Sequence, residues 1–155
     1  MTEYVLGFCF DTRLVMVLLI RKTRPEWVAG RLNGVGGKVR DGEAPVQAMG
    51  REFSEEACCG AKLDWVQFGT LRGSVDAVTS KPWLIYLFHS VNPASFFPVF
   101  EEPEGKTELH FVDNVVARGE LLRPLPSLRY LLPMALNHLR GDEVSLLDVR
   151  EVKSC

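Results

Sequence analysis

The stretch from Gly37 to Cys59 reads GKVRDGEAPVQAMGREFSEEACC, and it decides what fold and chemistry we expect of this 155-residue chain. Asp41-Gly42 predicts a turn, and Pro45 suits the first turn of a helix that runs to about Cys58. The N-cap position of that helix falls on Ala44, which is a poor capping residue. An apolar stripe predicts the face of the helix that packs on a core, and it consists of Val46, Met49, Phe53 and Ala57.

Three carboxylates lie on another face of the same helix. Glu52, Glu55 and Glu56 are spaced i, i+3 and i+4, so their like charges repel by roughly a few tenths of a kcal/mol per pair. A hard divalent cation such as Mg²⁺ prefers oxygen ligands and would offset this repulsion. Taken alone, the string is also typical of a solvated acidic helix face. Gly36-Gly37, just before the helix, favours the metal interpretation, because glycine backbone can approach a phosphate or offer a carbonyl to a metal.

The segment resembles the Nudix box, G-x5-E-x7-R-E-U-x-E-E-x-G-U, in which U is a bulky apolar residue. Phe53 fills the first apolar position, and Cys58 departs from the pattern where the box expects glycine, with Cys59 at the second apolar position. The box glycine helps the chain leave the helix, and Gly60 offers a substitute after a slightly longer helix. The six fixed letters that match are Gly37, Glu43, Arg51, Glu52, Glu55 and Glu56.

The resemblance implies a role for each matched residue. Glu52, Glu55 and Glu56 would bind Mg²⁺ or Mn²⁺ together with the backbone carbonyl of Gly36, and one of these glutamates serves as the base in some relatives. Arg51 would orient the glutamates, and Glu43 would support Arg51, so the implied catalytic set is Glu52, Glu55, Arg51 and Glu43. Many family members recruit a further acid from a later loop. Glu104 is our first candidate, and the alternatives are Glu101, Glu102 and Glu108.

Upstream, the segment from Ala29 to Val39 resembles the MutT-like branch of this family, which hydrolyses nucleoside triphosphates, including oxidised purine forms. The resemblance implies that Asn33 hydrogen-bonds the base, as suits an amide that both donates and accepts. Trp27 either stacks on the base or packs in a core or a lid. The basic residues of the loop either meet phosphates or are solvated surface, and the predicted substrate-binding set is Asn33, Trp27, Arg24, Lys38 and Gly37, with Lys22 a further phosphate candidate.

A second feature of the branch is missing. Oxidised-purine enzymes of higher organisms read the base with a tryptophan and paired aspartates just before the last helix. This chain has Leu125-Pro126-Ser127-Leu128 there, so the base preference stays open.

The rest of the chain predicts a mixed α/β (α+β) domain over residues 1–155. Tyr4–Asp11 and Leu14–Arg21 predict a hairpin, and a final helix is expected over Ser127–Leu139. The resemblance implies a Nudix-type α/β/α sandwich, with a mixed, partly antiparallel sheet between helices. Further strands are expected at Val35–Val39, Leu63–Leu71, Trp83–Ser90 and Leu109–Val116, with a structured loop over Asn92–Gly105.

Composition excludes several classes of protein. The net charge is −2 and the longest apolar run, Leu14–Ile20, falls far short of the roughly 20 residues that cross a bilayer. We therefore expect neither a membrane protein nor one that binds a nucleic acid polymer through its overall field. The N-terminus has no secretory pattern and the cysteines have no metal-binding spacing, so a cytoplasmic location is expected. The adjacent Cys58-Cys59 pair is interpreted as small buried thiols.

Three functions are compatible with these observations. The leading one is Mg²⁺-dependent hydrolysis of a nucleoside triphosphate to the monophosphate and pyrophosphate, by a monomer or homodimer. The second keeps the chemistry but takes ADP-ribose or another nucleoside diphosphate derivative. The third is a Nudix-fold nucleotide-binding regulator without turnover, which the intact Glu52, Glu55 and Glu56 disfavour.

Overall fold

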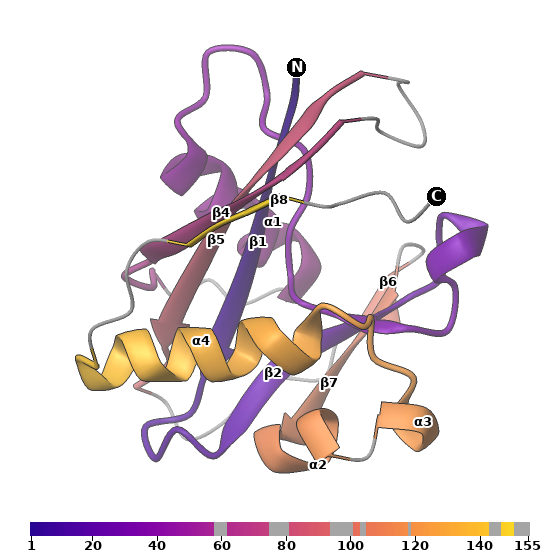
Figure 1. Ribbon diagram of the computed structural model, residues 1–155, viewed down its shortest axis with the longest axis vertical. Helices are drawn as coiled ribbons and strands as arrows, with labels where there is room; N and C mark the ends of the chain where they lie inside the picture. Colours follow the sequence, from indigo (N-terminus) through magenta and orange to yellow (C-terminus); the bar gives the residue numbers. More distant parts are fainter. Residues whose placement is uncertain are drawn as a thin grey trace.

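A mixed sheet forms the centre of the molecule in a computed structural model, which describes residues 1–57, 62–74, 81–93, 101–102, 105–117, 119–142 and 147–150. The strand order is β6-β7-β2-β1-β5-β4-β8, with β3 paired to β2 beside this row (Figure 1). The strands are β1 (Thr2–Phe10), β2 (Met16–Lys22), β3 (Leu32–Asn33), β4 (Val66–Gly73), β5 (Trp83–Val91), β6 (Glu101–Glu102), β7 (Gly105–Phe111) and β8 (Leu147–Arg150).

The sheet contains both antiparallel and parallel pairs of strands. β1 and β2 form the predicted antiparallel hairpin, with Cys9 opposite Leu18. On its other edge β1 runs parallel to β5, from Thr2 opposite Trp83 to Phe10 opposite Val91. The first strand of the chain therefore lies in the middle of the sheet, between elements far apart in sequence.

Helices cover both faces of the sheet, which confirms the expected α/β/α arrangement. Helix α4 (Leu128–Arg140) crosses the near face in Figure 1, and α1 (Pro45–Ala57) lies behind the sheet. Two short helices follow β7: α2 (Val112–Ala117) packs against α4, and α3 (Gly119–Leu122) lies next to α2. A 3-10 turn, η1 (Glu26–Val28), interrupts the loop between β2 and β3.

The alternation of side chains along β1 builds a separate core on each face. Phe8 and Phe10 point into the core beneath α4, whereas Val5 and Cys9 point into the core beneath α1. Gly7 shares the α1 side, and a Cβ there would lie 2.6 Å from the Sδ atom of Met49. Only glycine at this position lets α1 pack this closely on the sheet. This packing fixes the distance between the sheet and the helix face that carries the glutamates.

The N-terminus of α1 is capped by a side chain other than that of Ala44. The Ala44 N–H donates to Oε1 of Gln47 at 3.0 Å, and the Ala44 carbonyl accepts from the N–H groups of Gln47 and Ala48. Gln47 occupies the third helical position and so supplies the returning half of a capping box. The helix begins at Pro45 as predicted.

Two expected strands are wrong in part. Val35–Val39 forms no named strand, and only isolated bridges join it to β1, at Gly7–Val35 and Tyr4–Lys38. The expected strand Leu109–Val116 ends at Phe111 and continues as α2, because Val112 and Val115 bury one helical face beside α4. The Cys58-Cys59 pair, Gly60 and most of the predicted 92–105 loop lie outside the described residues.

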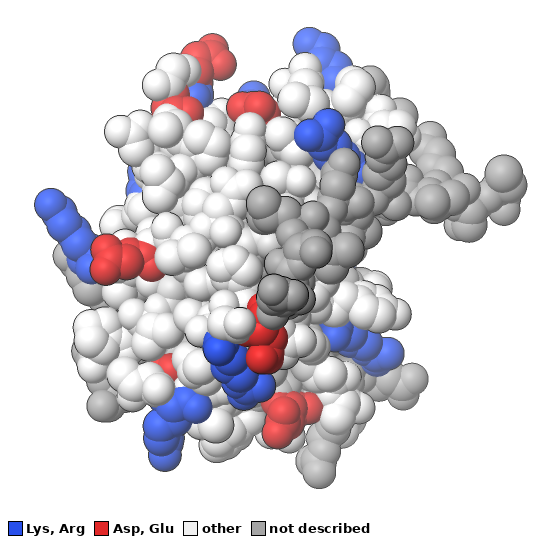
Figure 2. Space-filling view, turned by 60° about the vertical axis from the view of Figure 1, so that its left-hand side comes forward, with Lys and Arg blue, Asp and Glu red and all other residues white. Residues whose placement is uncertain are grey.

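Side chains of both charges are present on the surface, in keeping with the small net charge of the chain. On the face in Figure 2, Lys and Arg side chains alternate with Asp and Glu around a broad area that carries neither. Within the described part of the chain, no helix has the length and apolar character needed to cross a membrane.

Candidate active site

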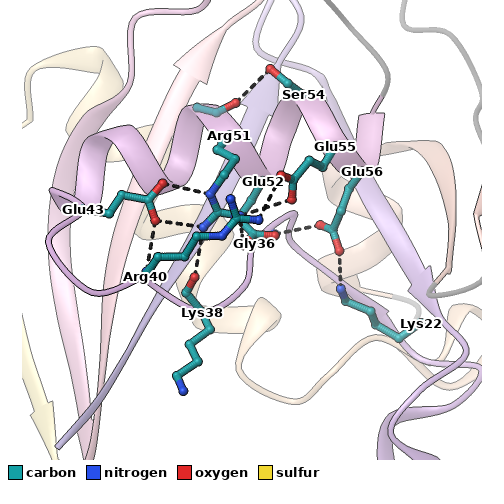
Figure 3. Close-up of polar contacts among 11 residues, drawn as sticks. Lys22, Gly36, Lys38, Arg40, Glu43, Arg51, Glu52, Ser54, Glu55 and Glu56 are labelled. Atoms are coloured by element: carbon teal, nitrogen blue, oxygen red, sulfur yellow. Dashed lines mark hydrogen bonds and ion pairs between the residues drawn. The ribbon is translucent and has the colours of Figure 1, made fainter.

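Arg51 is the centre of the polar network on α1. Its Nε and Nη2 donate to the two carboxylate oxygens of Glu43 at 2.8 and 2.9 Å. Its Nη1 donates to Glu52 at 2.6 Å and to Glu55 at 3.1 Å, and Nη2 also donates to the Lys38 carbonyl at 3.0 Å. All five N–H groups of the guanidinium are therefore used, and Figure 3 shows Arg51 between Glu43 and the helix glutamates.

Glu43 acts as the anchor of this arginine. Its carboxylate receives the bidentate pair from Arg51 and also accepts the Arg40 backbone N–H at 3.0 Å. These hydrogen bonds, first those from Arg51, lower the pKa of Glu43 to about 2. Paired fork geometry restricts both side chains, so Arg51 is held in one orientation toward Glu52 and Glu55.

Glu56 lies in a different environment from the other two glutamates. Its carboxylate is buried and accepts from Lys22 Nζ at 2.6 Å and from the Gly36 N–H at 2.9 Å. Burial raises the pKa of Glu56, and the hydrogen bonds and charge of Lys22 and the Gly36 N–H oppose this shift. The structure thus places the Gly36 N–H against a helix glutamate, whereas the predicted role of its carbonyl as a metal ligand stays a prediction. Lys22 has a carboxylate partner where we expected a phosphate contact (Figure 3).

Gly37 explains how Glu52 approaches the backbone so closely. A Cβ on Gly37 would lie 2.5 to 2.7 Å from the carboxylate atoms of Glu52. Beside this contact opens a shallow cavity of about 520 Å³ lined by Gly36 and Gly37, by the 38–41 segment, and by Arg51, Glu52 and Glu55. Four of the six fixed letters of the quoted motif, namely Gly37, Arg51, Glu52 and Glu55, therefore line one hollow on the surface.

Arg40 completes the cluster and is the contact that our sequence reasoning missed. Its Nη2 lies 3.3 Å from Oε1 of Glu55, whose side chain is half exposed. The sequence places Arg40 three residues before Glu43, and the Arg40 backbone N–H donates to the Glu43 carboxylate. This spacing is the feature that could have indicated Arg40. Arg40, Arg51 and Lys22 together offset the charge of the helix glutamates.

Three of the predicted substrate residues, Asn33, Trp27 and Arg24, lie before the helix and outside this network, whereas Gly37 and the Lys38 backbone belong to it. Asn33 is in β3 opposite Ile20, and its Oδ1 accepts the Gly34 N–H at 2.9 Å. Trp27 is in η1 and is 64% exposed, so the core interpretation of this ring is wrong. Arg24 is also exposed, and the Lys38 side chain points away from the glutamates in Figure 3.

The candidates for a further acid divide into two groups. Glu104 lies outside the described residues, as do the side-chain surroundings of Glu102. Glu101 is exposed and lies 3.9 Å from Lys106. Glu108 pairs with Leu19 in the β2–β7 register and so faces the α4 side of the sheet, away from the helix glutamates, because cross-strand partners share a face.

Comparison with known families identifies this arrangement. The sequence model of the NUDIX domain matches residues 3–123. The chain belongs to the NUDIX domain family and carries a Nudix hydrolase domain. No curated protein sequence matches the chain.

Solved structures share the fold at low sequence identity. A mutator MutT protein from Bacillus halodurans is 22% identical, with a TM-score of 0.61 over 85% of this chain and 82% of that one. The NUDIX domain of Shewanella oneidensis NrtR, solved with ADP ribose, is 15% identical, with a TM-score of 0.70 over 88% and 87%. The E. coli dihydroneopterin triphosphate pyrophosphohydrolase is 18% identical, with a TM-score of 0.67 over 87% and 95%.

Proposed function

We propose that residues 1–155 form a single domain that hydrolyses a nucleoside triphosphate, including oxidised purine forms, to the monophosphate and pyrophosphate with Mg²⁺. The observation that carries the proposal is the set of Glu52, Glu55 and Glu56 on one face of α1, in which Arg51 holds Glu52 and Glu55 and Lys22 holds Glu56. Membership of the NUDIX family supports the pyrophosphohydrolase chemistry. The choice of a nucleoside triphosphate as the substrate is supported by the sequence of the loop before α1, which resembles the MutT-like branch that takes these substrates.

The donor chemistry of the site fits Mg²⁺. Carboxylate and carbonyl oxygens are the ligands of a hard divalent ion, and Glu52, Glu55, Glu56 and the Gly36 carbonyl would hold it, or Mn²⁺ in its place. Glu104 is the proposed additional ligand. In the described part of the chain no three acidic, histidine or cysteine side chains already converge as a metal site. We attribute this to Lys22, whose ion pair with Glu56 must yield when a metal binds, and to Arg51, which occupies oxygens of Glu52 and Glu55.

Bound Mg²⁺ would supply charge neutralisation for the polyphosphate and lower the pKa of an attacking water. The residues of the chain do the rest. Arg51, fixed by Glu43, orients Glu52 and Glu55, and one of these two carboxylates accepts the proton of that water. The water oxygen forms the new bond to phosphorus as the bond to the leaving phosphate oxygen breaks.

Substrate recognition falls to the loop between β2 and α1. The Asn33 amide hydrogen-bonds the base, and the exposed Trp27 ring stacks on it. Arg24 and Lys38 meet the phosphates, which would require the Lys38 side chain to turn toward the cavity. Gly37 leaves room for the polyphosphate beside Glu52.

A substrate panel with Mg²⁺ tests the proposal. The panel contains the common nucleoside triphosphates, an 8-oxo-purine triphosphate and ADP-ribose, and release of pyrophosphate and phosphate is measured. We expect pyrophosphate from a triphosphate, and a loss of at least about tenfold in Glu55→Gln. Asp113→Asn, an exposed change on α2 at the other face of the sheet, is the matched control and should retain full activity.

Each other outcome identifies a different function. Undiminished activity in Glu55→Gln would contradict the metal-site assignment. Much faster cleavage of ADP-ribose than of any triphosphate would establish the second hypothesis. Tight binding of one nucleotide without turnover would establish a regulatory module.

A further inference from the structure

The last two residues of β2 point to opposite faces of the sheet. Lys22 reaches Glu56 on the α1 side. Arg21 therefore extends on the α4 side, as Leu19 does. Its Nε and Nη2 donate to the two carboxylate oxygens of Glu108 at 2.6 and 2.8 Å. Arg21 thus forms a fork on the face of the sheet that the glutamates of α1 do not use.

The remaining part of this fork joins two segments of backbone. Nη1 of Arg21 donates to the Gly30 carbonyl at 2.9 Å and to the Leu122 carbonyl at 3.1 Å. Gly30 belongs to the 23–31 loop, and Leu122 is the last residue of α3. A single nitrogen therefore ties the loop and the end of α3 to the same point on β2.

The partner of the fork is itself held in place. Glu108 accepts from Nε2 of His110 at 2.7 Å, next to its contacts with Arg21. The Arg21 and Glu108 side chains are 30% and 23% exposed, so water competes less with this pair than with a fully solvated ion pair. Hydrogen bonds from Arg21, and then from His110, outweigh burial and lower the pKa of Glu108. The carboxylate therefore stays charged and remains a partner for the guanidinium.

Directly after the loop, β3 is also hydrogen-bonded to the 121–125 segment. The Leu32 N–H donates to the Arg123 carbonyl at 3.0 Å, and the Leu125 N–H donates to the Leu32 carbonyl at 2.9 Å. At its base the loop is closed by Gly30 N–H to the Lys22 carbonyl at 2.8 Å. The loop that carries Arg24 and Trp27 is thus fixed from the opposite side of the sheet.

We propose that Arg21 is a positioning residue for nucleotide binding, which holds the 23–31 loop and the 121–125 segment as one unit. The nucleotide part of this inference rests on the proposed function. Arg21 makes its contacts away from Glu52, Glu55 and Glu56, so its loss weakens binding and leaves the chemical step almost intact. A lysine at this position keeps the charge but cannot form the fork and reach both carbonyls at once.

Steady-state kinetics and amide hydrogen exchange together test the proposal. In Arg21→Gln we expect KM for the nucleotide to rise at least tenfold, with kcat within threefold of wild type. Exchange should accelerate in both the 23–31 and the 121–125 peptides. Arg21→Lys should keep at least a threefold rise in KM, and Arg129→Gln, an exposed change on α4, should match wild type in every measurement.

A second variant protects the test against a folding failure. Glu108→Gln keeps the shape of the partner but removes its charge and one acceptor, so we expect a smaller rise in KM and faster exchange in the same two peptides. Unchanged KM and exchange in Arg21→Gln would overturn the proposal, as would a fall in kcat as large as the rise in KM. If the wild type hydrolyses no nucleotide, the proposed function fails, and the exchange measurements still decide whether Arg21 orders both segments.

Discussion

Replacing Gly37 with alanine should separate activity from stability in this protein. The new Cβ would lie 2.5 to 2.7 Å from the Glu52 carboxylate, whereas carbon atoms make good contacts at roughly 3.5 to 4.0 Å. The carboxylate must therefore move by about 1 Å, and a displacement of this size in a catalytic geometry can lower the rate by about 100-fold. Because the clash falls on the end of a flexible side chain, the fold can accommodate it.

The expected change in stability is small for a second reason. Displacing Glu52 weakens its ion pair with Arg51, which destabilises the folded protein by at most about 1 kcal/mol. Alanine also lowers the conformational entropy of the unfolded chain, which stabilises the folded protein by a similar amount. For a protein of this size, 1 kcal/mol corresponds to a change in Tm of roughly 2 to 4 °C. We therefore expect kcat to fall by about 100-fold while Tm stays within this range.

The assay combines pyrophosphate release at saturating substrate with a thermal melt. Gly50→Ala is the matched control on α1, because a Cβ there meets no atom within 4 Å, and it should raise stability by roughly 0.5 to 1 kcal/mol with full activity. Gly37→Ala should lower kcat no further when Glu52 is already alanine. Wild-type kcat in Gly37→Ala would refute the reasoning, because Glu52 would then not need its observed position.

Three further predictions concern charge. Arg51→Lys cannot form the bidentate pair with Glu43, so kcat should fall by at least about tenfold, and an unchanged kcat would contradict the role of Arg51. Burial, and then the proximity of His138, lower the pKa of His89 to about 4, so the unfolded chain takes up this proton first. The free energy of unfolding, measured with urea, should therefore fall as the pH drops from about 6.5 to 4, whereas a flat profile would contradict a buried, neutral His89. A chelator should abolish hydrolysis but leave Tm nearly unchanged, because Lys22 and Arg51 already compensate the carboxylates, and unfolding on chelation would contradict this.

The sequence predicts α1 and its acidic face well because both are local. Pro45 at the first turn, the apolar stripe and the 52, 55, 56 spacing all lie within a few helical turns, where backbone geometry alone sets direction. The cap at Ala44 was less visible, since its partner is the side chain of Gln47, three residues later. The family resemblance rests on this segment for the same reason.

Contacts that depend on the packing of distant elements could not be predicted in this way. Lys22 reaches Glu56 because of the distance between the sheet and α1. The close packing of Met49 on Gly7 determines this distance. Strand alternation places Glu108 on one of two faces, but only the register with β2 shows that this face lies opposite α1. Val35–Val39 pairs with β1 through isolated bridges and forms no continuous strand. The residues of this segment alone do not indicate that the pairing is so short.

The position of β1 has a consequence for the order in which this protein folds. β1 is made first, but its parallel partner β5 begins at Trp83, about half of the chain later. The β1–β2 hairpin can form early because its strands are neighbours, whereas the central sheet must wait until β5 has been synthesised. Pairings between such distant segments slow folding, so we expect this domain to fold more slowly than a helical bundle of equal length. The apolar side chains of β1 lack their β5 neighbours during that interval, so this strand is exposed to aggregation until β5 pairs with it.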